Sequence, residues 1–265
     1  MRFIKLKFRA KAETKIQKRF HMPKKVWIPL AVVLVIAGVP VLALGWMGFV
    51  PGLSTIMGST SQRNLDVNFT QQNLASFQQK MPLAIKDDTL APINPINTEQ
   101  KELLAQPIQA QNVALSQEDV TATLNSYHWS WIPVNNIQVR LTDGTVEVSG
   151  LLNNDHLDAF EQYVANGHSL SPSVANAISW SKHFRNYAPV YLRAKVYVTN
   201  NVLSFKLEQA QIGRLDIPLG LAGSTLRQGV YANIKANNLD IQTAYFSDKT
   251  LHFGGTYPSV IYVRN

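Results

Sequence analysis

The sequence predicts an α+β protein in which an N-terminal transmembrane helix precedes an extracytoplasmic domain. That domain is expected to hold a curved antiparallel sheet covered on one face by helices. Three observations lead to this prediction. Residues 26–50 contain no charged residue. Three later segments alternate apolar and polar residues around a short turn, as β-hairpins do. Five further segments carry apolar residues at helical spacing.

The uncharged run, VWIPLAVVLVIAGVPVLALGWMGFV, is long enough to cross a bilayer. As a helix it would reach roughly 37 Å, and a bilayer hydrocarbon core is about 30 Å thick. Trp27 and Trp46 lie near its ends, where indole rings favour the membrane interface, so both are predicted interface anchors. The alternative is a cleaved signal peptide, although the apolar part of such peptides usually spans only about 7–15 residues.

The charge of residues 1–25 predicts the orientation of this span. This basic cytoplasmic tail carries ten Lys and Arg residues and one Glu, and Arg19, Lys24 and Lys25 lie nearest the span. Because such residues stay on the cytoplasmic side, we expect the C-terminal domain to lie outside the cell membrane. The tail either lies on the anionic inner leaflet or is a disordered segment that only sets topology.

The rest of the chain argues against a nucleic-acid partner. Since the whole chain carries +8 and the tail +9, residues 26–265 sum to −1, and the high pI belongs to the tail. We expect residues 51–64 to form a juxtamembrane linker and residues 65–265 to form one domain. Within it, the proline-rich residues 82–112 argue against long regular elements. Residues 83–96 are expected to hold a short edge hairpin around Asp87-Asp88. The chain has no Cys, so its stability cannot depend on disulfides.

Two helices are predicted at residues 71–80 and 117–125. Thr70 and Ser116 are suitable N-caps, and the second helix has a capping-box variant with Asp119. The eight residues from 67 match the eight from 113 in their order of apolar, polar and cap positions. Either the chain contains an internal duplication, or two helices share a common start signal.

Three hairpins are predicted at residues 137–149, 190–207 and 239–253. Their turns are Asp143-Gly144, Asn200-Asn201 and Asp248-Lys249, and the first is a strong hairpin signal. The matching polarity of the three predicts one antiparallel sheet with a single apolar face. Helices at residues 157–164, 172–186 and 224–236 would complete the cover of that face.

Catalytic and metal-binding motifs are absent from the sequence. It contains no H-E-x-x-H, no thiol, no G-x-S-x-G and no glycine loop that would bind phosphate. We therefore expect no cofactor, no metal, no catalytic residue and no enzymatic activity. A hydrolase with paired carboxylates stays open as a third hypothesis, because such pairs are distant in sequence.

Two aromatic clusters are the candidate ligand-binding residues. One contains Trp129 and Trp131, and the other contains Trp180, Phe184 and Tyr187. Aromatic side chains with a polar tip suit sites that are partly wet and partly apolar. The clusters form either core packing or an apolar ligand groove or membrane-facing rim.

Two longer motifs carry a resemblance to a known family. The hairpin PVNNIQVRLTDGTVEVSG begins at Pro133, and VLSFKLEQAQIGRLDIP begins at Val202. Together with the single span, these resemble the YpmS-like family of single-span bacterial envelope proteins over roughly residues 113–256. The chain is also loosely similar to lipid-binding actinobacterial envelope proteins. The helical insert at residues 154–187 departs from the family pattern.

The resemblance implies an extracytoplasmic domain that handles lipids or other envelope amphiphiles, and it brings no catalytic residue. Our first hypothesis is a membrane-anchored domain with a lipid ligand. The alternative is a protein-interaction or scaffold module of cell-envelope assembly, which would have an envelope protein partner.

Overall fold

A computed structural model describes residues 39–44, 46, 52–87, 107–127, 132–165, 175–176, 179, 182, 186–217 and 240–263. The chain divides into two compact units, residues 1–41 and 42–265, and every described strand belongs to the second. Residues 39–44 and 46 are helical. Among the described residues, no helix combines the length and apolar character needed to cross a membrane. Most of the predicted span, residues 26–38, lies outside them.

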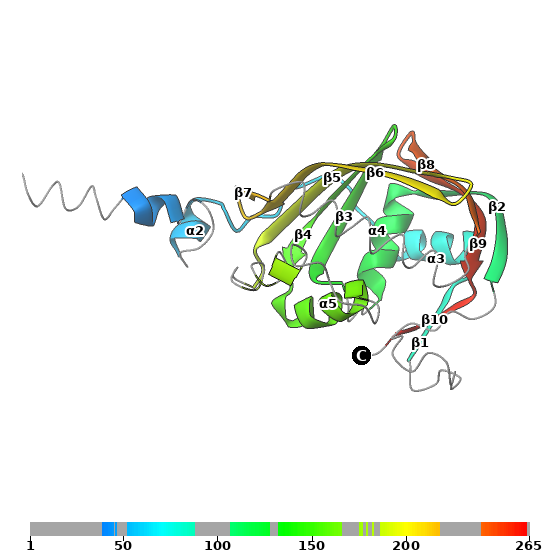
Figure 1. Cartoon of the computed structure of the whole chain (residues 1–265), viewed down its shortest axis with the longest axis horizontal. Coiled ribbons are helices and arrows are strands. Elements are labelled where there is room, and N and C mark those ends of the chain that lie inside the picture. The colour runs from blue at the N-terminus through cyan, green and yellow to red at the C-terminus, as the bar shows by residue number, and fades with distance from the viewer. Residues whose placement is uncertain are drawn as a thin grey trace, which may run out of the picture. The chain divides into compact units, whose positions relative to one another are not determined.

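An eight-stranded antiparallel sheet forms most of the domain (Figure 1). Its main order is β2-β9-β8-β5-β4-β3, with β6 on the other edge of β5 and β7 beside β6. The strands are β2 (Pro107–Ser116), β3 (Val134–Thr142), β4 (Thr145–Leu152), β5 (Pro189–Thr199), β6 (Val202–Ile212), β7 (Leu215–Asp216), β8 (Ile241–Ser247) and β9 (Thr250–Pro258). The α+β class and the three predicted hairpins, β3–β4, β5–β6 and β8–β9, are confirmed.

The tip of the β3–β4 hairpin lies between β5 and β8. On one edge of β5, β4 pairs as far as Lys195, and β8 then pairs with the last two residues of the strand. Gly144 at the tip donates its N–H to Phe246 O (2.9 Å) and accepts from Val196 N (3.2 Å). Phe246 also packs against the buried side chains of β3. The sheet therefore curves, and β8–β9 faces the same core as β3.

Helix α4 (Gln117–Ser126) lies along the free edge of β3. Its side chains Gln117, Thr121 and Asn125 accept from the backbone N–H groups of residues 141, 139 and 137, at 3.2, 3.1 and 2.9 Å. Four helical residues rise about 6 Å and two strand residues about 6.8 Å, so the two spacings match. The side chains of α4 thus hydrogen-bond the backbone N–H groups of an edge strand, which would otherwise be unpaired.

The two predicted N-terminal helices are confirmed and pack against each other. They are α3 (Gln71–Lys80) and α4, and each begins with a capping box. Asp119 of α4 is buried and accepts from Lys80 (2.8 Å), Ser76 (3.2 Å) and Ser116 N (3.2 Å). Burial alone would raise the pKa of Asp119, but these bonds and the charge of Lys80 lower it below its ordinary value.

The chain that leads into α3 and the chain that leads into α4 share a backbone conformation. Asp66 and Asn112, both four residues before the cap, have left-handed φ values of 55° and 52°. Their surroundings differ, because Phe69 in the first copy is exposed and the corresponding Leu115 is buried. The local conformation is therefore common to both copies and the packing is not.

One expectation about the proline-rich segment was wrong, and most of the expected hairpin at residues 83–96 lies outside the described residues. The first strand of the segment, β1 (Ala84–Asp87), pairs with β10 (Val260–Val263), which runs parallel to it. Strand β2 is a ten-residue regular element that starts inside this segment. Pro107 is tolerated because it is the first residue of an edge strand.

The remaining predicted helices are only partly described. A turn of 3₁₀ helix, η2 (Asn154–His156), leads into α5 (Leu157–Ala165), and the Asn153 side chain caps this turn by accepting from Asp155 N. In the helix expected at residues 172–186, Ala175, Asn176 and Ser179 are helical. The helix expected at residues 224–236 lies outside the described residues.

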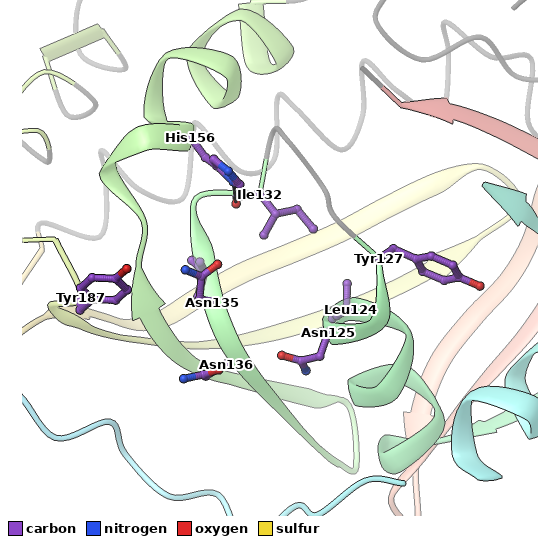
Figure 2. Close-up of a pocket in the computed structure, with 9 residues that line it drawn as sticks. Leu124, Asn125, Tyr127, Ile132, Asn135, Asn136, His156 and Tyr187 are labelled. Atoms are coloured by element: carbon purple, nitrogen blue, oxygen red, sulfur yellow. Dashed lines mark hydrogen bonds between the residues drawn. The ribbon is translucent and has the colours of Figure 1, made fainter. Parts of the chain in front are cut away.

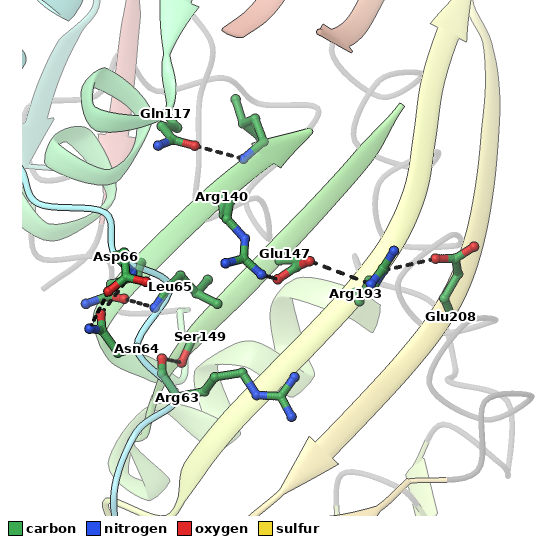
Figure 3. Close-up of polar contacts among 12 residues, drawn as sticks. Arg63, Asn64, Leu65, Asp66, Gln117, Arg140, Glu147, Ser149, Arg193 and Glu208 are labelled. Carbon is green, nitrogen blue, oxygen red and sulfur yellow. Dashed lines mark hydrogen bonds and ion pairs between the residues drawn. The ribbon is translucent and has the colours of Figure 1, made fainter. Parts of the chain in front are cut away.

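The sheet is covered on part of its second face as well, which corrects the expectation of a single covered face. Residues 62–67, termed the strap, cross the polar side of β3, β4 and β5 (Figure 3). Ser149 donates to Arg63 O (2.6 Å), and Leu65 N donates to the Gln138 side chain (2.7 Å). Leu65 is buried, together with Val67 and Tyr191. The polar residues Thr145, Glu147 and Ser149 on the same side of β4 are also buried, and Ser149 contacts the strap directly.

Candidate functional site

A cavity of about 340 Å³ lies between the C-terminal end of α4, the start of β3 and η2 (Figure 2). Residues from these elements, and one from the turn before β5, form its walls. They are Leu124, Asn125, Tyr127, Ile132, Val134, Asn135, Asn136, His156 and Tyr187.

A bulge in β3 shapes one wall of the cavity. The pairing of Asn135 with Leu151 is followed by that of Gln138 with Ser149, and Asn136 adopts a left-handed φ of 51°. On the opposite strand, a Cβ atom at Gly150 would lie 2.2 Å from Val134 Cγ1 and 2.9 Å from Asn135 O. Only glycine therefore leaves room for this bulge without a local shift.

The amide of Asn125 fixes the end of α4 against β3. Its Nδ2 donates to Thr121 O and Ile137 O, both at 2.7 Å, and its Oδ1 accepts from Ile137 N. These bonds leave little capacity for a ligand. We assign Asn125 a role in positioning the wall of the cavity.

Hydrogen bonds to neighbouring elements fix the other walls of the cavity. His156 Nδ1 lies 3.0 Å from Ile132 O, which ties η2 to the chain entering β3. The Tyr127 hydroxyl accepts from Gln78 of α3 (3.0 Å). Tyr187 is held through its backbone, with φ of 66° and its N–H donating to Leu152 O (2.8 Å), while 59% of the residue is exposed.

The cavity combines apolar and neutral polar chemistry. None of its lining residues is Asp, Glu, Lys or Arg. Leu124, Ile132 and Val134 supply apolar surface. Within the described part of the chain, the side chains of Asn135 and Asn136 and the Tyr187 hydroxyl make no hydrogen bond. The site can therefore contact an apolar group and hydrogen-bond an uncharged polar group at the same time.

The structure describes few of the residues predicted for a site. Tyr187 lines the cavity. The others predicted for the groove, Trp129, Trp131, Trp180 and Phe184, lie outside the described residues. So do the predicted anchor Trp27 and the topology-setting Arg19, Lys24 and Lys25. Trp46 is described and exposed, and the guanidinium of Arg214 lies 5.4 Å from its ring centroid.

The polar residues of the cavity were not predicted from the sequence. Asn135 and Asn136 interrupt the alternation of the first hairpin just after Pro133, and Gly150 stands opposite in the second strand. An interrupted strand facing a glycine is the signal of a bulge and could have identified them. His156 was not singled out either, because no partner at metal-ligand spacing accompanies it in the sequence.

A row of alternating charges crosses the polar side of β3, β4, β5 and β6 (Figure 3). Buried Glu147 accepts from Arg140 and pairs with Arg193 (3.8 Å), which also pairs with Glu208 (3.2 Å). Lys195 pairs with Glu208 as well (3.2 Å) and, more than the neighbouring Arg193, lowers the pKa of that carboxyl. The row neutralises the buried carboxylate of Glu147, so its role is structural.

A serine and a histidine also meet on the β8–β9 hairpin. Ser247 Oγ lies 2.9 Å from His252 Nε2, and the His252 ring stacks on Tyr245 with centroids 4.7 Å apart. The distance suits a nucleophile and its base, but such pairs also need a third group that orients the base. Among the described residues no carboxylate hydrogen-bonds the imidazole, and the pair carries no catalytic assignment.

No protein-family model, curated protein or solved structure matches this chain. What the protein does is therefore inferred from its own sequence and geometry.

Proposed function

We propose that this protein is a membrane-anchored, non-enzymatic extracytoplasmic domain that binds a lipid or another uncharged envelope amphiphile. The observation that carries the proposal is the cavity at the end of α4. Apolar side chains and neutral amide and hydroxyl groups line the same space there, and no charged side chain takes part. An amphiphile presents that combination of groups.

The size of the cavity limits what it can hold. About 340 Å³ is near the lower end of the range for small-molecule sites, about 300–1,000 Å³. The space accommodates an uncharged head group with the first part of an acyl or isoprenoid chain, and not a complete phospholipid. Tyr127 and Ile132 both line it, and the segment that joins them in the sequence contains Trp129 and Trp131.

The predicted span supports the same proposal. Residues 26–50 would keep the domain beside the membrane in which such a ligand is dissolved. The resemblance to YpmS-like bacterial envelope proteins points to the same compartment. Both statements stay predictions.

The test is lipid analysis of the full-length protein purified in a mild detergent. Native mass spectrometry and lipid extraction would be applied to the parent and to Asn135→Ala and Tyr187→Ala. The matched control is Tyr197→Ala, which removes a similarly exposed tyrosine of β5 (52% against 59%) that does not line the cavity. We expect a bound amphiphile in the parent and the control, and its loss in the two cavity variants. A parent without ligand, or equal retention in all variants, would refute the proposal.

A second candidate function, a protein-interaction module, is favoured by the free edge of β6. Within the described residues, β6 pairs with β5 along its length and with β7 only at Gln211 and Ile212. Its residues 202–209 therefore offer unpaired backbone groups to an added strand, since Ala210 O already accepts from Ile217 N (2.8 Å). Because the chain has no Cys, crosslinking through Ser204→Cys in the full-length protein would trap one specific envelope protein if this function is correct. An empty result would count against it.

A further inference from the structure

The chain that leaves the predicted span folds into a compact knob, defined as residues 52–60. It contains α2 (Leu53–Ile56), and Met57 N donates to Leu53 O (2.9 Å). Ser59 donates both its N–H and its hydroxyl to Ser54 O, each at 2.9 Å. Ser54 and Ser59 are fully or almost fully buried. The knob is thus an internally bonded unit, which the sequence did not indicate.

One large apolar side chain of the knob points into solvent. Ile56 is 85% exposed, more than any other large apolar residue in the described part of the chain. A single exposed isoleucine is ordinary on a protein surface. This one, however, comes six residues after the predicted end of a membrane span, where a bilayer is the nearest apolar phase.

A cation and an indole accompany this isoleucine. Arg214, in the turn between β6 and β7, donates to Met57 O (2.9 Å), next to Ile56, and lies over the ring of Trp46. Figure 1 shows α2 beside β7, as this bond requires. Arg214 and Trp46 are both exposed. An exposed apolar residue, an indole and a base form the combination that binds the interfacial layer of a membrane.

Chain length keeps this patch close to the bilayer. Only three residue steps separate the predicted end of the span, Val50, from Leu53. At most about 3.5 Å per residue, they reach roughly 10 Å. The head-group layer on each side of the hydrocarbon core is about 5–8 Å thick. The knob therefore has to lie within or directly above the head groups.

The residues that follow the knob bond to the sheet and to the wall of the cavity. In the strap that follows it, the guanidinium of Arg63 lies 3.6 Å over the Tyr191 ring and donates to Gln211 (3.2 Å). Gln62 donates to Asn136 O (2.7 Å), the backbone of a residue that lines the cavity. A contact that holds the knob at the membrane surface therefore also positions the cavity end of the sheet.

We propose that Ile56, Trp46 and Arg214 form a second membrane contact, which docks on anionic head groups and holds the cavity end of the domain at the bilayer surface. The proposal rests on the membrane anchor of the proposed function. A basic residue near an anionic surface strengthens binding about fivefold. The contact should therefore respond to the anionic lipid content and to the charge of Arg214.

The absence of native Cys allows a direct measurement of depth. Ile56→Cys would carry a nitroxide label in the full-length protein, reconstituted in nanodiscs of phosphatidylcholine with or without phosphatidylglycerol. The matched control is Val202→Cys at the β5–β6 turn, an apolar residue that is 67% exposed. The accessibility of the label to oxygen, compared with its accessibility to a water-soluble nickel chelate, reports how deep the label lies in the bilayer. We expect the label at position 56 at the level of the head groups and the label at position 202 in water.

The role of Arg214 is tested in the same discs. Arg214→Gln should move the label at position 56 toward water in the discs with phosphatidylglycerol, and Arg214→Lys, which keeps the charge, should restore its depth. If an inserted protein shows equal water exposure at positions 56 and 202, the docking proposal is overturned while the ligand proposal stands. A chain that does not insert overturns both the anchor and the docking. A buried label at position 56 without any co-purified amphiphile supports docking and refutes only the ligand.

Discussion

Thr121 carries the clearest energetic consequence of the contact between α4 and β3. Its hydroxyl accepts from Val139 N (3.1 Å) and donates to Val139 O (3.4 Å), and the residue is completely buried. Thr121→Val keeps the shape of the side chain and removes the hydroxyl. The backbone N–H of Val139 then remains buried without a partner, since β3 has no neighbouring strand on this edge among the described residues.

The size of the effect depends on that unpaired group. A buried donor without a partner costs about 1–3 kcal/mol, and we expect about 2 kcal/mol for Thr121→Val. In a domain of this size, that loss lowers the melting temperature by about 4–8 °C. Thr123→Val is the matched control on the same helix. The hydroxyl of Thr123 donates only to Asp119 O, within the helix (2.9 Å), so the control should lose well under 1 kcal/mol.

The assay is thermal unfolding of the full-length protein in detergent, followed by circular dichroism. Hydrogen exchange at the Val139 amide provides a local readout and should become faster in Thr121→Val only. If the two valine variants melt together, or if the Val139 amide stays protected in both, α4 does not satisfy the edge of β3 and the reasoning is refuted.

Three further predictions concern the strap, the helix pair and the bulge. Leu65→Ala removes a buried side chain and should destabilise the domain by about 3 kcal/mol, whereas Phe69→Ala, at an exposed position, should change the melting temperature little. Because the folded-state pKa of Asp119 lies below the ordinary value of about 3.9, its carboxylate stabilises the fold above that pH. This stabilisation is lost as the pH falls through the lowered folded-state value, so melting curves of Asp119→Asn should depend less on pH below about pH 4 than those of the parent; equal dependence would contradict the assignment. Gly150→Ala should cost about 1–3 kcal/mol by overpacking against Val134 and should release the bound amphiphile; a variant with unchanged stability and ligand content would show that the bulge does not depend on this glycine.

The elements that depend on neighbouring residues were predictable from the sequence. The helix beginning at residue 117 is specified by Ser116 and Asp119, which form its capping box. The turn at Asp143-Gly144 and the alternation around it specify the first hairpin. In each case the interactions that select the structure lie within about ten residues, so the local pattern contains the information.

The polar stripe of α4 shows where local reasoning stops. Gln117, Thr121 and Asn125 are spaced like the solvent face of an amphipathic helix. In the structure they hydrogen-bond the edge of β3. A polar position on a helix can face water or an unpaired strand, and the sequence of the helix is the same in both cases.

The candidate site was predictable only in part, for a similar reason. Tyr187 was noticed because aromatic residues suit a ligand groove, whereas Asn135 and Asn136 carry no such chemical signal. They reach the cavity because the bulge opposite Gly150 turns that part of β3 out of its regular pairing. The bulge depends on packing between two strands, and a single strand does not reveal it.

By itself, the sequence determined the α+β class, the two capped helices and the three hairpins, because short-range hydrogen bonds and turn conformations select them. It also contains the uncharged run and the basic tail, on which the predicted anchor rests. Only the tertiary structure decided that β1 pairs with the distant β10, that the strap crosses the polar side of the sheet at Ser149, and that a neutral cavity forms beside Asn135. Those features join residues far apart in the chain, and such contacts stabilise the protein only when the whole domain has folded.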